Sequence, residues 1–215
     1  NTAVLFGDGA GAVVVEESKN PEDGEIFSFV NGLSSDKLDI LEIPNFGSAM
    51  DRFKSDEAAK VRWTFDGQEI FKGGIRAMAT ASEEVIIKSG LTKEDIGLLI
   101  PHQANLRIVE GLEKMLKLPN AKTIKKVHKY GNTSAASIPT ALVDALEEGE
   151  IKGGEVAVLT AVGAGLSWGA CAVRLGKRTD PINTSDAKLP DFDGKAVDTI
   201  RKAIEYQVPE KLDLI

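Results

Sequence analysis

Residues 96–105 have the sequence IGLLIPHQAN, and residues 131–137 have the sequence GNTSAAS. The apolar run from Ile96 to Ile100 is closed by Pro101 and predicts a short buried strand. In an α/β sheet, functional side chains gather at the carboxyl ends of the strands, which is where His102 falls. Asn132 follows the flexible Gly131 and begins a small-residue helix expected to run to Gly149. We therefore expect His102 and Asn132 to point into one cleft.

The remaining pattern alternates between helical and strand spacing. Apolar residues at helical spacing predict one helix over 70–86, ended by Gly90, and a second over 106–116. Strand-like sequence predicts two β-hairpins, one over residues 2–16 around a glycine-rich turn and one over residues 155–175. The alternation predicts an α/β layer architecture, with a mixed sheet flanked by helices.

Composition excludes several classes of protein. The chain has 215 residues and a formal net charge of -7, so no global positive field attracts nucleic acid. The sequence lacks the run of about 18 apolar residues that a membrane span needs. Its single cysteine, Cys171, excludes an internal disulfide framework and favours the reducing cytoplasm. Because the chain starts at Asn1 in strand-like sequence, we expect it to be a fragment or a processed piece.

Basic residues gather between the two quoted stretches. Seven lie from Arg107 to Lys129, against two acidic residues, Glu110 and Glu113, which gives a local balance of +5. Such a run is commonly a solvated helix face, and it also suits docking of an acidic partner. Both alternatives stay open at this point.

Four motifs together resemble one known family. The two quoted stretches, with LFGDGAGA at residues 5–12 and GAGLSWG at residues 163–169, are similar to the C-terminal half of β-ketoacyl-acyl-carrier-protein synthase III. The resemblance covers about residues 2 to 175 and implies a thiolase-like layered α/β fold. It divides the chain into a domain at 1–175, a linker at 176–194 and an amphipathic extension at 195–215, for which the family offers no role.

The resemblance implies a decarboxylative condensation of an acyl-CoA primer with malonyl-acyl-carrier protein, which starts fatty acid synthesis. His102 and Asn132 would then donate neutral hydrogen bonds to the enolate oxygen, and the Ala164 backbone N–H would contribute to the oxyanion hole. Two further sets of residues follow from the resemblance: a pantetheine tunnel of Phe65, Gly67, Ile70, Phe71, Gly74 and Asn105, and a carrier-protein docking surface of Arg107, Lys114 and Lys117.

The family's nucleophilic cysteine belongs to its N-terminal half. We therefore expect this chain to be incomplete as an enzyme and to need that half, as a companion chain or as lost sequence. The resemblance implies a homodimer when complete, coenzyme A and phosphopantetheine as substrate carriers, and neither a permanent cofactor nor a metal.

Three alternatives remain. One is a related condensing enzyme of polyketide or alkylquinolone synthesis, which shares every quoted motif. Another is a non-catalytic module that keeps the pantetheine tunnel. The third is a Cys-His-Asn hydrolase that uses Cys171, although this thiol lies among apolar, strand-like residues with no base beside it in the sequence.

Overall fold

The computed structural model describes residues 4–36, 38–43, 64–180, 198 and 201. The chain forms two compact units, one of Asn1–Leu41 with Phe65–Pro181 and one of Glu42–Thr64 with Ile182–Ile215. The second unit contains few described residues, of which Asp198 and Arg201 form an ion pair at 3.5 Å. The predicted extension at 195–215 otherwise lies outside the described residues, as does most of the predicted linker. The first unit carries the sheet and every predicted site residue.

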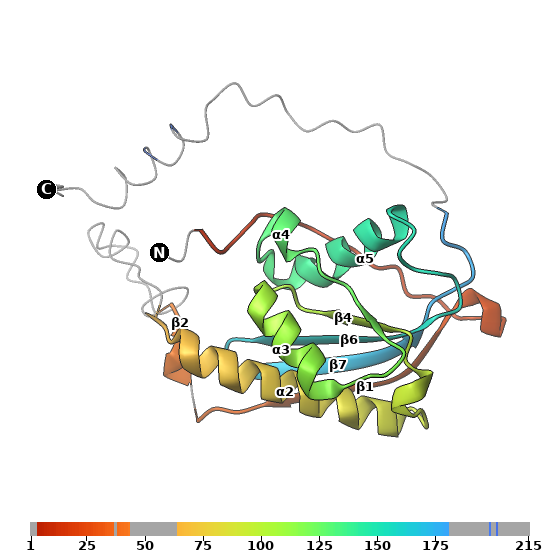
Figure 1. Cartoon of the computed structure of the whole chain (residues 1–215), viewed down its shortest axis with the longest axis horizontal. Helices are drawn as coiled ribbons and strands as arrows, with labels where there is room; N and C mark the ends of the chain where they lie inside the picture. The colour runs from red at the N-terminus through yellow and green to blue at the C-terminus, as the bar shows by residue number, and fades with distance from the viewer. Residues whose placement is uncertain (1–3, 37, 44–63, 181–197, 199–200, 202–215) are drawn as a thin grey trace, which may run out of the picture. The chain divides into compact units, whose positions relative to one another are not determined.

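A mixed sheet with the strand order β1-β7-β6-β4-β5 forms the centre of this unit (Figure 1). β4 runs parallel to its neighbours β5 and β6, whereas β7 runs antiparallel to β6 and β1. The predicted mixed α/β sheet and the hairpin of β6 and β7 are confirmed. The strands are β1 (Glu25–Leu33), β4 (Leu98–Pro101), β5 (Lys122–Thr123), β6 (Val156–Gly163) and β7 (Ser167–Arg174), and β2 (Leu41–Glu42) pairs separately with β3 (Thr64–Phe65).

Helices cover both faces of the sheet. α2 and α3 pack on one face and α5 packs on the other, as Figure 1 shows. Four short 3-10 turns complete the described elements. The α-helices are α2 (Gly67–Lys88), α3 (Leu106–Leu116), α4 (Val127–Tyr130) and α5 (Ser137–Glu147), and the 3-10 turns are η1 (Pro21–Asp23), η2 (Leu38–Ile40), η4 (Lys93–Asp95) and η5 (Ser134–Ala136).

The core explains why residues 96–100 form an unbroken apolar run. Leu99 packs with α2 and α3, whereas Leu98 and Ile100 pack with α5. All three side chains are at most 1% exposed. A strand covered on both faces needs apolar residues on both, so continuous rather than alternating hydrophobicity is expected.

The predicted helix over 70–86 is confirmed as α2. Asp66 caps its first turn, because its Oδ1 accepts the backbone N–H groups of Gln68 and Glu69 at 3.1 and 3.0 Å. Gly90 follows the helix with φ +68°, a left-handed conformation that glycine adopts without a side-chain clash. α2 therefore begins and ends close to where its sequence pattern does.

The predicted hairpin over residues 2–16 is wrong. From residue 4 to residue 20 the described backbone forms one β-bridge, between Phe6 and Asn132, and no strand. The apolar residues Val13, Val14 and Val15 are 70–89% exposed. β-branched residues favour a strand only when a partner strand satisfies the backbone, and the described sheet ends on β1 and β5 without pairing to this segment. β1, which the sequence pattern did not predict, forms the edge instead.

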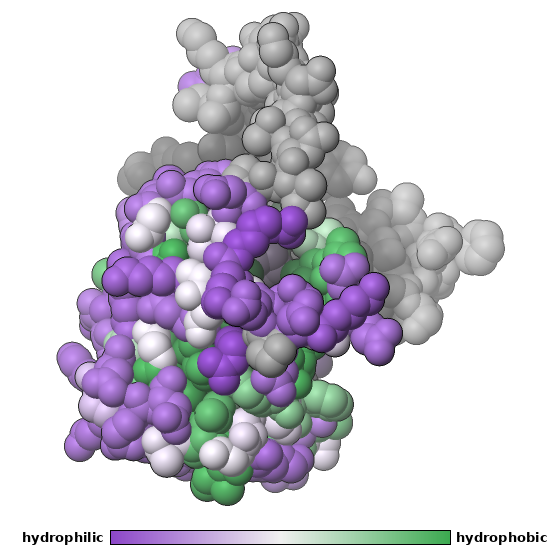
Figure 2. Space-filling view, turned by 90° about the vertical axis from the view of Figure 1, so that its right-hand side faces the viewer, coloured by the Kyte–Doolittle hydropathy of each residue, from purple (hydrophilic) through white to green (hydrophobic). Residues whose placement is uncertain are grey.

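The face of the described part that Figure 2 shows is mostly polar. Figure 2 shows the end of the molecule at the right of Figure 1, where hydrophilic side chains dominate and hydrophobic ones show between them. The edge strand β1 exposes three large apolar side chains, Ile26, Phe29 and Leu33. Within the described ranges, no helix is both long and apolar enough to cross a bilayer.

Candidate functional site

His102 lies directly after β4, at the carboxyl end of the strand, as predicted. Its backbone N–H donates to the Thr160 carbonyl at 2.7 Å, which continues the pairing of β4 with β6. The residue is 9% exposed, and its Nδ1 lies 2.6 Å from Ser137 Oγ. Burial lowers the pKa of the imidazole, because the charged form loses hydration. His102 is therefore a neutral side chain at neutral pH.

Asn132 is held by its backbone between α4 and η5. Its N–H donates to the Leu5 carbonyl at 2.9 Å, and its carbonyl accepts the Gly7 N–H at 3.0 Å. Its side-chain Oδ1 accepts the Ser134 N–H at 2.9 Å, which forms a tight turn. Among the described residues, no acceptor engages the Asn132 Nδ2 group, so its two N–H donors remain available to a ligand.

The hydrogen bond to Ser137 joins His102 to the chain segment that also contains Asn132. Ser137 is the first residue of α5 and follows Asn132 by five positions in the same segment. His102 Nδ1 is therefore hydrogen-bonded to the segment that presents Asn132. This contact between residues 35 positions apart was not predicted from the sequence.

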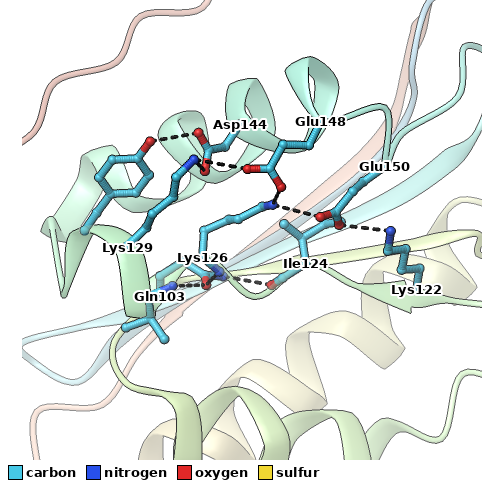
Figure 3. Close-up of polar contacts among 10 residues, drawn as sticks. Gln103, Lys122, Ile124, Lys126, Lys129, Asp144, Glu148 and Glu150 are labelled. Atoms are coloured by element: carbon cyan, nitrogen blue, oxygen red, sulfur yellow. Dashed lines mark hydrogen bonds and ion pairs between the residues drawn. The ribbon is translucent and has the colours of Figure 1, made fainter.

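Gln103 is a second residue that sequence reasoning missed. It is 2% exposed, and its amide makes four hydrogen bonds to backbone groups. Nε2 donates to the carbonyls of Pro101 and Ile124 at 2.7 and 3.1 Å, while Oε1 accepts the N–H groups of Lys126 and Val127 at 2.8 and 3.2 Å. This side chain ties the end of β4 to the segment that leads through α4 to Asn132 (Figure 3). Its place inside the PHQAN motif was the available signal.

A buried lysine lies at the centre of an ion-pair cluster beside Gln103 (Figure 3). The Lys126 side chain is 5% exposed and donates to Glu148 and, at 2.8 Å, to Glu150. Burial alone would lower the pKa of Lys126, but the two carboxylates outweigh it and raise the pKa. Hydrogen bonds from Lys126 and Lys122 lower the pKa of Glu150 to about 2. The cluster therefore stays ionised at neutral pH.

The same contacts correct the expected basic stretch. Four lysines of this stretch each form an ion pair with a carboxylate: Lys122, Lys125, Lys126 and Lys129. For three of the four, the carboxylate belongs to residues 144–150. The local balance of +5 is thus largely neutralised by acidic residues that lie outside the counted window. The predicted docking residues Arg107, Lys114 and Lys117 are exposed and form no ion pair within the described part of the chain.

Asn105 has a structural role at the start of α3. Its Oδ1 accepts the Ile108 N–H at 2.9 Å and so caps the helix. This cap leaves the other side-chain polar atom, Nδ2, for the predicted contact with a pantetheine arm. That atom has no partner among the described residues.

The other predicted tunnel residues lie at the beginning of α2 and just before it. Ile70 and Gly74 are buried, whereas Phe65 and Phe71 are each 37% exposed and Gly67 is exposed. A shallow cavity of about 280 Å³ lies elsewhere, lined by residues of β1, β6, β7 and α5, and includes none of these five. The tunnel stays a prediction.

Ala164 and Cys171 lie on the β6–β7 hairpin. Ala164 is exposed in the turn, and its carbonyl accepts the Ser167 hydroxyl at 3.1 Å. Cys171 faces Leu159 across the hairpin, and burial raises the pKa of its thiol. A raised pKa disfavours the thiolate that a nucleophile requires, which argues against the hydrolase alternative. Among the described residues, no group of three or more His, Cys, Asp and Glu side chains is placed to hold a metal ion.

Two sequence models of one family match the chain. The model described as 3-oxoacyl-(acyl-carrier-protein (ACP)) synthase III C terminal matches residues 86–175, and the model described as 3-oxoacyl-(acyl-carrier-protein (ACP)) synthase III matches residues 1–34. Together the matches cover more than half of the chain. They contain His102, Asn132 and Ala164 but not the beginning of α2.

Curated relatives agree with these matches. The chain is 46% identical over 211 residues to a beta-ketoacyl-(acyl-carrier-protein) synthase III 2 of Vibrio cholerae, covering 96% of this chain and 56% of the relative. It is 47% identical over 176 residues to the beta-ketoacyl-(acyl-carrier-protein) synthase III of Listeria monocytogenes, covering 82% and 51%. The chain thus spans about half the length of the curated relatives it matches.

Solved structures show the same fold. The 3-oxoacyl-(acyl carrier protein) synthase III of Pseudomonas aeruginosa PAO1 superposes with a TM-score of 0.72 at 35% identity, over 82% of this chain and 52% of that one. The priming beta-ketosynthase of the R1128 polyketide pathway superposes with a TM-score of 0.65 at 29% identity, over 71% and 45%.

Proposed function

Because the chain belongs to the 3-oxoacyl-(acyl-carrier-protein) synthase III family, we propose that it supplies the His/Asn part of a Cys-His-Asn condensing site. The reaction is the decarboxylative condensation of an acyl-CoA primer, such as acetyl-CoA, with malonyl-acyl-carrier protein, which initiates fatty acid synthesis. The observation that carries this proposal is the neutral, buried His102 at the end of β4, hydrogen-bonded to the segment that holds Asn132.

The chemistry follows from these two side chains. The bond between the malonyl α-carbon and its carboxylate breaks, carbon dioxide leaves, and the electron pair spreads onto the thioester oxygen. His102 and the Asn132 Nδ2 group donate hydrogen bonds to that oxygen, and one such donor is worth on the order of 3 kcal/mol. The carbanion then attacks the acyl thioester, whose oxyanion accepts the Ala164 N–H, and a thiolate leaves.

The acyl group needs a nucleophile that this chain does not offer at the site. Its single cysteine, Cys171, has a raised pKa, and within the described residues no hydrogen bond connects it to His102 or Asn132. We assign the acyl-carrying cysteine to the N-terminal half of the same enzyme, which completes the site and the homodimer. The chain covers 56% of its Vibrio cholerae relative, which leaves room for such a half.

Substrate carriers bind on the face formed by α2 and α3. Arg107, Lys114 and Lys117 are exposed cations that form no ion pair with any described residue, and they suit an acidic acyl carrier protein. Its phosphopantetheine, or that of coenzyme A, would pass along Phe65, Gly67, Ile70, Phe71 and Gly74 to reach Asn105. Both thioesters are substrates rather than resident cofactors, and the reaction takes place in the cytoplasm.

The division of the chain remains part of this proposal. Residues 1–175 would form the catalytic half-domain, residues 176–194 a linker, and residues 195–215 an amphipathic extension.

A second candidate is a condensing enzyme that primes polyketide synthesis. It is supported by the similarity to the R1128 priming beta-ketosynthase, at 29% identity. The two candidates share the chemistry at His102 and Asn132 and differ in the primer they accept.

The decisive experiment separates decarboxylation from acylation in the protein that carries this chain. We expect His102→Ala and Asn132→Ala each to slow decarboxylation of malonyl-acyl-carrier protein by roughly 10²-fold. The acetyl adduct that intact-mass spectrometry detects after incubation with acetyl-CoA should persist. His128→Gln is the matched control, because His128 is exposed on α4. A folded His102→Ala protein that decarboxylates at the wild-type rate would contradict the proposed role of His102. It would favour the alternative of a non-catalytic module that binds pantetheine.

A further inference from the structure

Ser137 lies where it can control which nitrogen of His102 carries the hydrogen. Its Oγ is 2.6 Å from His102 Nδ1, and both residues are buried, at 2% and 9% exposure. The contact is as short as a strong O–H···N hydrogen bond and is shielded from water. The direction of this hydrogen bond therefore decides the state of the imidazole.

The other contact of Ser137 Oγ settles the direction. A hydroxyl has one hydrogen to donate and two lone pairs to accept with. The Gln103 N–H already donates to Oγ at 3.2 Å. If Nδ1–H donated as well, the hydroxyl hydrogen would need a third partner, and none is found among the described residues. The arrangement that satisfies every group has the hydroxyl donating to Nδ1.

A neutral imidazole that accepts at Nδ1 carries its hydrogen on Nε2. The surroundings disfavour a second proton on the ring. His102 is buried, and Ser137 is the first residue of α5, where the partial positive charge of the helix N-terminus opposes an imidazolium. The ring thus keeps one hydrogen, and that hydrogen is directed away from Ser137.

We propose that Ser137 is a positioning residue, whose hydroxyl holds His102 as the Nε2–H tautomer and so supplies the N–H donor for the substrate's thioester oxygen. This inference rests on the proposed function, but it concerns a property of the protein without substrate. Ser137 itself touches His102 and not the reacting atoms.

The first test reads the tautomer directly. In protein labelled with ¹⁵N-histidine, long-range ¹H–¹⁵N correlation spectra distinguish a protonated ring nitrogen from an unprotonated one. A His102→Gln variant lacks the His102 signals, so comparing its spectrum with that of the wild-type protein assigns them. We expect His102 to show an unprotonated Nδ1 and a protonated Nε2. A protonated Nδ1 in the wild-type protein would overturn the inference.

The second test removes the hydroxyl. Ser137→Ala should give a mixed tautomer and raise the pKa of His102, because the donor to the neutral ring is lost. The acidic limb of the decarboxylation profile should move to higher pH, and the rate should fall about tenfold or more. Ser137→Thr, which restores a hydroxyl, should recover both. Thr140→Ala removes a hydroxyl one turn further along α5, where it bonds to the Ala136 carbonyl at 2.8 Å, and should change neither.

The two proposals fail in different ways. A wild-type protein with the expected tautomer but no decarboxylation would count against the proposed function alone, since the spectrum needs no substrate. A Ser137→Ala protein with an unchanged tautomer and an unchanged acidic limb would count against the role of Ser137, whatever its rate.

Discussion

Replacing Gln103 with alanine should be among the most destabilising substitutions in this chain. The change removes four hydrogen bonds at once and leaves two backbone N–H groups and two carbonyls without their partner. Three of these backbone groups belong to buried residues, Pro101, Ile124 and Lys126. Water therefore does not readily replace the Gln103 side-chain amide as their hydrogen-bond partner. The consequence is a cluster of unsatisfied groups between β4 and α4.

The magnitude follows from that count. A typical hydrogen bond contributes about 1 kcal/mol net, and a buried group left unsatisfied costs about 1–3 kcal/mol. Four bonds with partial relaxation give a loss of about 4 kcal/mol in the free energy of unfolding. For a domain of this size that corresponds to a fall of roughly 10 °C in Tm.

Urea denaturation followed by circular dichroism measures the loss. Gln68→Ala provides the control, because Gln68 is exposed in the first turn of α2. Gln103→Glu is a more specific probe. One carboxylate oxygen can still accept the Lys126 and Val127 N–H groups. The other oxygen replaces the NH₂ group and faces the Pro101 and Ile124 carbonyl oxygens, to which it cannot donate when ionised. The introduced carboxyl should have a raised pKa, so this variant should gain stability relative to wild type as the pH falls. A loss below about 1 kcal/mol in Gln103→Ala would refute the reasoning, since the four contacts would then be worth less than one ordinary bond.

Two further outcomes follow from the ionisable groups. Glu150 has a pKa lowered from 4.5 to about 2 in the folded protein, so its contribution to stability is present above pH 4.5 and is lost as the pH falls toward 2. Glu150→Gln should therefore lower the urea midpoint at pH 7 and change it much less at the lowest pH at which the protein still folds. An equal change at both pH values would mean that the Lys126 pairing is not what shifts this carboxyl. Cys171, whose pKa burial raises, should react with iodoacetamide several-fold more slowly than free cysteine at pH 8, and Cys171→Ala should keep decarboxylation unchanged. Rapid labelling together with lost activity would revive the hydrolase alternative.

The spacing of apolar residues predicted the elements that can be recognised from a single segment of sequence. The apolar face of α2 lies within one segment, and the strand β4 with His102 at its end follows from an apolar run closed by proline. The predicted hairpin over residues 2–16 failed because a strand depends on a partner, and the sequence of the segment does not show whether one is present.

Side-chain contacts between residues far apart in the sequence could not be predicted either. Lys126 pairs with Glu148 and Glu150, which lie 22 and 24 positions away, so counting charges within a window from 107 to 129 gave a false excess. Ser137 and Gln103 escaped notice for a related reason. Serine and glutamine are ordinary surface residues in sequence, and only burial against their partners makes their hydrogen bonds decisive.

The bridge between Phe6 and Asn132 has a practical consequence for anyone who would transplant this site. Two backbone hydrogen bonds hold the asparagine, one donated to the Leu5 carbonyl and one accepted from the Gly7 N–H. A Cβ atom at Gly7 would lie 2.0 Å from the Tyr130 carbonyl oxygen. The loop at 131–137 is therefore held in place by a segment that lies more than a hundred residues earlier in the sequence. A graft of GNTSAAS onto a foreign scaffold would need to carry a segment equivalent to residues 5–7, including the glycine. Without that segment the side-chain amide of Asn132 would not keep its orientation.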